Sequence, residues 1–144
     1  FVSSNYYYDS YPDWVRNWNS AGKLDRYAGQ HWELTNEPDS YQRIDQDDNV
    51  WETDFPGYGR TFPHAWGDRG SKYFTTLLTV SPAGDELTLA FEKTLLLEEG
   101  LGEDGVPDYL SISFSSTDYV GHLFGSSSLD RSFSMLCEEG VATS

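Results

Sequence analysis

Two stretches of the chain place apolar residues at helical spacing. In the first, Pro12 suits the opening turn of a helix and Gly22 can end it. Between them, Trp14, Val15 and Trp18 fall on one helical face. The pattern predicts a short amphipathic helix, and we expect its aromatic face to pack into the core rather than to form a platform for a ligand.

The second stretch predicts a longer helix. Ser81 fits its N-cap and Pro82 its first helical position, while Gly100 and Gly102 end the pattern. The apolar stripe of this helix consists of Leu87, Ala90, Phe91, Leu95, Leu97 and Leu101. We expect this stripe to face the core.

A strand is predicted next, over 109–114. Leu110, Ile112 and Phe114 share one face, while tyrosine and serine residues occupy the other. A helix followed by a strand is typical of an α/β unit, so we predict an α/β fold with a mostly parallel sheet. The aromatic run 1–8 is also strand-like. Because the chain opens inside that run, we expect it to be an internal segment of a longer protein.

Composition divides the chain into three regions. Residues 1–70 form an irregular, aromatic and acidic region with the short helix, 71–130 form the α/β unit, and 131–144 are assigned to no element. In the first region, Asp45, Asp47 and Asn49 have the spacing that opens a calcium loop. The glycine and the closing glutamate of an EF-hand are missing, so we predict a solvated acidic turn.

Length and charge narrow the classes of function. The 144 residues suit one domain, and 24 acidic against 9 basic side chains give a formal net charge of −15. Such a charge argues against binding nucleic acid through its phosphates. No apolar run approaches the roughly 18 residues of a membrane helix, so no membrane segment is predicted. The single cysteine, Cys137, excludes an intrachain disulfide framework and a cysteine-rich zinc finger.

Candidate chemistry follows the predicted strand. Asp118 and His122 are four residues apart, which on a helix places both side chains on one face. A carboxylate and an imidazole suit zinc, and sites in α/β sheets form beyond the carboxyl ends of strands. The alternative is that Asp118 caps the helix beside a surface or core His122. No spacing joins His31 or His64 to the pair, and we expect His64 to pack in a loop.

The stretch 107–125, PDYLSISFSSTDYVGHLFG, resembles the central motif of PafA-type alkaline phosphatases. These enzymes are related to the type I phosphodiesterases and nucleotide pyrophosphatases of the alkaline phosphatase superfamily. Segments 1–19, 62–64 and 81–89 are similar to parts of the same family in the same order. The resemblance thus covers about Phe1 to Asp130. The stretch 131–140 departs from the amphipathic helix that the family has there.

The resemblance implies part of an alkaline-phosphatase-like sandwich, in which helices flank a mostly parallel sheet and an irregular aromatic-rich insertion precedes the motif. It also implies a zinc enzyme with two metal ions, one of which Asp118 and His122 would bind. The family's threonine nucleophile would precede Phe1, so Thr117 is not that residue, and further ligands would follow Ser144. The isolated chain is therefore expected to be inactive.

The implied substrates are small-molecule phosphate monoesters, and the family implies a periplasmic or secreted protein. Two alternatives stay open. The first is a phosphodiesterase or nucleotide pyrophosphatase of the same superfamily. The second is a non-catalytic carbohydrate-binding module, since five Trp, ten Tyr and eight Phe could supply aromatic surfaces for sugars.

Overall fold

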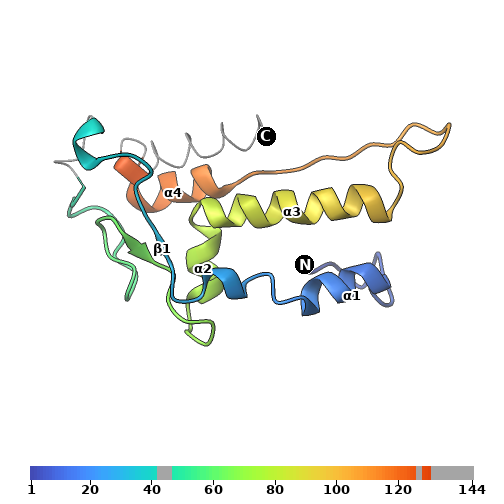
Figure 1. The fold of residues 1–144 in the computed structure, drawn as a ribbon, viewed down its shortest axis with the longest axis horizontal. Coiled ribbons are helices and arrows are strands. Elements are labelled where there is room, and N and C mark those ends of the chain that lie inside the picture. Colours follow the sequence, from blue (N-terminus) through green and yellow to red (C-terminus); the bar gives the residue numbers. More distant parts are fainter. Residues whose placement is uncertain (42–46, 126–127, 131–144) are drawn as a thin grey trace.

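The computed structural model describes residues 1–41, 47–125 and 128–130. Most of the regular structure is helical, and a two-stranded sheet lies at one end (Figure 1). In chain order the elements are α1 (Asp13–Ser20), η1 (Asp25–Tyr27), β1 (His31–Trp32), η2 (Pro38–Ser40), β2 (His64–Ala65), α2 (Phe74–Thr79), α3 (Pro82–Glu98) and α4 (Ser116–Phe124). The tail 131–144, which the sequence left unassigned, lies outside the described residues.

The first predicted helix is confirmed as α1, and its aromatic face packs as expected. Val15 is buried, and the rings of Trp14 and Trp18 lie 5.4 and 5.5 Å from that of Phe91 on α3. The run 1–8, strand-like in its sequence, forms no strand; residues 5–7 make a turn and the others have no regular structure. Phe1 instead stacks on Phe91, with ring centroids 4.6 Å apart. Phe1, one of the aromatic residues of this run, thus covers part of α3.

The second predicted helix is confirmed as α3, with Ser81 at its N-cap and Pro82 at its first position. The Ser81 hydroxyl makes no cap bond; it donates to the Leu78 carbonyl and accepts from the Trp66 indole. Gly100 follows the helix at φ +61°, a conformation that favours glycine. The apolar stripe is covered only in part, since Leu97 is 77% exposed.

The predicted parallel sheet is not found among the described residues. Their sheet has two antiparallel strands, in which His31 of β1 faces Ala65 of β2 and Trp32 faces His64. The segment 109–114 is an uncoiled trace that returns from the far end of α3 to α4 (Figure 1), and it pairs with no strand of the described part. Alternation predicts a strand but cannot supply its partners, because a strand forms only when neighbouring chain is present.

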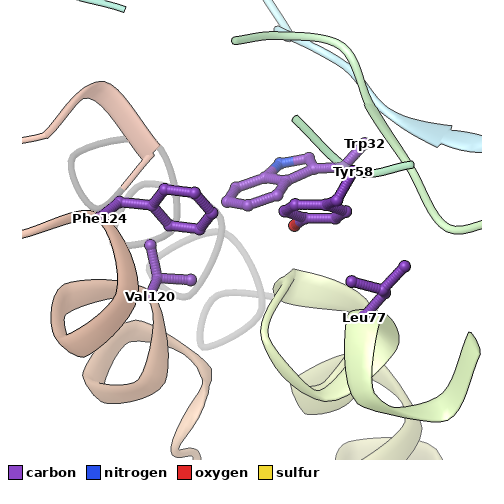
Figure 2. Packing of buried hydrophobic residues seen from close by; sticks show 5 residues of the cluster. All are labelled: Trp32, Tyr58, Leu77, Val120 and Phe124. Carbon is purple, nitrogen blue, oxygen red and sulfur yellow. The ribbon is translucent and has the colours of Figure 1, made fainter. Parts of the chain in front are cut away.

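Two clusters of buried side chains form the core. The first joins β1, the loop before β2, α2 and α4, as Figure 2 shows. Its buried members are Trp32, Tyr58, Leu77, Val120 and Phe124. The second joins η1, α2 and the start of α3 through Tyr27, Phe74, Leu78 and Ala83. No helix of the described residues is long and apolar enough to cross a membrane.

Candidate metal centre

The helix α4 has one buried face and one exposed face. Ser116, Val120 and Phe124 repeat every four residues and are buried. Asp118 and His122 repeat at the same interval on the other face, and their side chains are 75% and 77% exposed. Because the buried residues fix which face turns inward, the same packing keeps both candidate ligands outside the core.

The two candidate ligands lie together as the spacing predicts. The Oδ2 atom of Asp118 is 3.5 Å from the Nε2 atom of His122. Two tetrahedral zinc bonds of about 2.0–2.1 Å separate their donor atoms by about 3.4 Å. A carboxylate oxygen and an imidazole nitrogen at this separation therefore fit two of the four positions around zinc. Asp118 also suits its position, since an acidic group in the first turn of a helix interacts favourably with the helix dipole.

A neighbouring helix caps the start of α4. Asp85, in the first turn of α3, is buried and accepts hydrogen bonds from the backbone amides of Ser115 (3.1 Å) and Ser116 (3.3 Å). The serine at the N-cap makes no such bond itself. Gly84 allows the close approach, because a Cβ there would lie 3.0 Å from the Ser116 hydroxyl and 3.1 Å from the Thr79 carbonyl. Asp85 and Ser115 are 30 positions apart, so no local spacing in the sequence points to this contact.

The far end of α4 is held by the loop that precedes β2. The amide of Thr53 donates to the carbonyl of Leu123 at 2.9 Å, and the ring of Phe124 lies 6.0 Å from that of Tyr58. Gly125 follows at φ +93° and ends the helix. The helix that carries both candidate ligands is therefore anchored at its two ends by different parts of the chain.

The remaining histidines do not complete a metal site within the described part of the chain. There, no three or more His, Cys, Asp or Glu side chains are grouped so that they could hold a metal ion. His31 is exposed, and His64, expected in a loop, lies in β2 fully buried. The Nε2 atom of His64 is 2.6 Å from the Oδ1 atom of Asp130. The 66 residues between them leave no local pattern by which this pair could be found.

The acidic turn is less solvated than predicted. Asp47 is partly buried and accepts a hydrogen bond from the Phe62 amide at 3.0 Å. Burial raises the pKa of Asp47 to about 6, and the negative charge of Asp130 acts in the same direction. The backbone amide of Asn49 donates to the carboxylate of Glu52. Asp45 lies outside the described residues.

Two strongly exposed aromatic residues near the start of the chain do not form a flat surface for a sugar ring. Tyr6 and Tyr7 are 86% and 73% exposed, but their rings are perpendicular, with an angle of 87° between the planes. Sugar-binding platforms need rings that share a plane or follow one another along it. Three further aromatic residues of this region, Phe1, Trp14 and Trp18, contact Phe91.

Comparison with known proteins finds relatives that match nearly the whole chain, and two of the three described here are named alkaline phosphatases. Alkaline phosphatase PhoV of Synechococcus elongatus is 34% identical over 131 residues, and alkaline phosphatase PafA of Elizabethkingia meningoseptica is 28% identical over 132. A Myroides odoratus protein named calcium-transporting ATPase is 35% identical over 133 residues. Each match covers 90% of this chain and 24% of the relative. No family model matches the chain.

The structural comparison agrees. The crystal structure of wild-type alkaline phosphatase PafA superposes with a TM-score of 0.78 and 28% sequence identity, covering 92% of this chain and 26% of PafA. The resemblance to PafA-type alkaline phosphatases, stated from the sequence, is therefore confirmed, and with it the similarity to that fold. The chain spans about a quarter of the length of the curated relatives it matches.

Proposed function

We propose that this chain is part of a zinc-dependent phosphomonoesterase of the alkaline phosphatase type, and that Asp118 and His122 supply two ligands to one of its two zinc ions. The observation that carries the proposal is the 3.5 Å contact between an exposed carboxylate oxygen and an exposed imidazole nitrogen on α4. The similarity to alkaline phosphatases over 90% of the chain supports the class of enzyme.

The roles of the two side chains follow from their chemistry. Asp118 contributes a negative charge that holds a cation, and His122 contributes a neutral nitrogen donor. Zinc bound between them would supply positive charge that stabilises the developing charge on phosphoryl oxygens. The threonine nucleophile and the remaining ligands belong to parts of the enzyme outside this chain. The same resemblance supports a periplasmic or secreted location.

We also propose that the segment 109–114 becomes a strand of a mostly parallel sheet in the whole protein. Its alternating apolar residues are suited to such a strand, and Tyr109, Ile112 and Phe114 are exposed in this chain. The segment leads directly into α4, so both proposed ligands would lie beyond the carboxyl end of that strand, where α/β proteins form their sites.

Metal content tests the assignment. In the full-length enzyme, Asp118→Asn or His122→Ala should remove about one zinc per chain and lower turnover of a phosphate monoester at least about 100-fold, because an incomplete ligand set binds zinc weakly. Asp13→Asn is a matched control, since Asp13 is also an exposed carboxylate in the first turn of a short helix. Unaltered zinc content in both ligand variants, measured by elemental analysis, refutes the assignment.

A diesterase on the same scaffold is the other outcome to be distinguished. The relatives named alkaline phosphatases favour a monoesterase. Comparing kcat/KM for a phosphate monoester and a phosphate diester with the full-length protein decides between the two. A higher value for the diester would reassign the substrate and leave the metal ligands unchanged.

A further inference from the structure

His64 and Asp130 form a buried pair that the proposed chemistry does not use. Their side chains are 0% and 1% exposed, and the Nε2 and Oδ1 atoms are 2.6 Å apart. The Nδ1 atom of His64 lies 3.3 Å from the carbonyl oxygen of Tyr58. Because a carbonyl only accepts, Nδ1 carries a hydrogen, and the carboxyl group and Nε2 share a further proton.

Aromatic rings surround this pair and keep water away from it. The His64 ring stacks on Tyr58 at 4.4 Å, and the ring of Phe62 is 4.6 Å away. The ring of Phe124, at the end of α4, is 5.5 Å away. In such surroundings a hydrogen bond between charged or proton-sharing groups is directional and strong, and an unmatched partner is costly.

Asp130 depends on His64 for this bond. Among the described residues its second oxygen, Oδ2, is buried without a hydrogen-bond partner. The nearby charges do not help, because Asp47 and Asp130 repel each other. The bond from His64 therefore ties the residues after α4 to β2.

We propose that His64 and Asp130 are positioning residues for the proposed zinc site. Their bond ties the residues just beyond α4 to β2, and the His64 ring lies beside Phe124 at the end of the helix. The pair thus adds to the contacts of Asp85 and Thr53 in setting the direction in which α4 presents Asp118 and His122. This inference rests on the proposed function, since its effect is exerted on zinc binding.

Two substitutions separate positioning from simple packing. Asp130→Asn can donate an amide hydrogen to an unprotonated Nε2 while Nδ1 still donates to Tyr58, so the geometry is kept with neutral groups. The double variant His64→Leu with Asp130→Val replaces both partners with apolar groups, which commonly restores stability. In the full-length protein we expect the zinc affinity of Asp130→Asn to stay within about threefold of that of the unsubstituted protein. The double variant should bind zinc at least about 10-fold more weakly, which is the size of loss seen when groups that support metal ligands are removed.

Zinc affinity is measured by competition with a fluorescent chelator, on variants whose folding is checked by circular dichroism and by their unfolding transition. Asp48→Asn is the control. Asp48 pairs with Arg60 in the loop before β2, the loop that also contains Tyr58. A folded double variant that binds zinc like the unsubstituted protein would overturn the inference. An Asp130→Asn variant as weak as the double variant would do so as well.

The companion variant Asp118→Asn separates a failure of the positioning role from a failure of the proposed zinc site. If it loses zinc while the double variant does not, the positioning role fails and the proposed function stands. If it keeps all its zinc, the proposed function fails, and the positioning role fails with it.

Discussion

A partly buried carboxylate in an acidic chain lowers the stability of the folded protein when it is ionised, so its effect depends on pH. Asp47 accepts a bond from the Phe62 amide, yet burial and the nearby Asp130 make its ionised form less favourable. Its pKa is raised from 3.8 to about 6. The folded protein therefore holds this proton more tightly than the unfolded chain, so stability from this group is present below about pH 4 and lost as the pH rises through about 6.

Asp47→Asn should therefore stabilise the full-length protein at pH 7. The amide oxygen of the substituted side chain can still accept from Phe62, but it carries no charge. We expect the free energy of unfolding to rise by about 1 kcal/mol at pH 7, less than the full linkage value because solvent screens a partly exposed group. Urea denaturation at pH 7 and at pH 4 measures the effect.

The difference between Asp47→Asn and the unsubstituted protein should shrink toward zero at pH 4. Asp48→Asn, which removes an exposed carboxylate from the neighbouring position, is the control for the loss of one negative charge. A difference that is the same at both pH values would show that Asp47 does not titrate in this way.

Among the elements, α4 shows how a short helix depends on contacts from other parts of the chain. It has nine residues and no side-chain cap of its own, and Asp85 of α3 accepts from its first amides. Short helices are marginal alone and rely on packing and capping. The exposed face of α4, which carries Asp118 and His122, therefore depends on the contact between α3 and α4.

Removing this cap should loosen the start of α4. Asp85→Ala leaves the amides of Ser115 and Ser116 without an acceptor, and we expect a loss of about 2 kcal/mol in the free energy of unfolding. Hydrogen exchange of the peptide 115–125 in the full-length protein should become faster. Asp85→Asn keeps an acceptor in place and should retain most of the protection; equal exchange in both variants would argue against capping.

The elements that the sequence predicts correctly are those whose pattern is local. α1 and α3 follow from residues three or four apart and from proline, serine and glycine at their ends. The spacing that brings Asp118 to His122 is local as well. The contact of Asp85 with α4 and the pair of His64 with Asp130 join residues 30 and 66 positions apart. Only the folded arrangement brings such residues together, so no spacing predicts them.

At the scale of the molecule, the chain leaves an apolar segment without partners. Ile112 and Phe114 are 38% and 40% exposed, and 109–114 forms no sheet with the described residues. Leu97 of α3 is also exposed, at 77%. Extended apolar segments with unpaired backbone groups associate with one another unless they are covered. These surfaces are suited to be covered by further chain, as the proposed function requires.

The isolated chain 1–144 should therefore be inactive and prone to associate. It lacks the proposed nucleophile and most of the proposed ligands, so we expect no turnover of a phosphate monoester above background. Light scattering after gel filtration should detect oligomers or aggregates, and Ile112→Lys should reduce them more than Val106→Lys, which changes an exposed residue of the preceding turn. Robust phosphatase activity of residues 1–144 alone would contradict the proposal.

The anchoring of α4 at both ends has a consequence for metal exchange. Asp118 and His122 are attached one turn apart to a single rigid helix, so their backbones cannot separate without breaking helical hydrogen bonds. In the proposed zinc site, the backbone positions of these two ligands are therefore fixed, and only rotation of their side chains can change the distance between their donor atoms. If zinc were replaced there by a larger ion such as cadmium, the longer bonds would have to be accommodated by these rotations and by ligands from elsewhere in the protein. The activity of the proposed enzyme with substituted metals would then show how far the remaining ligands can move.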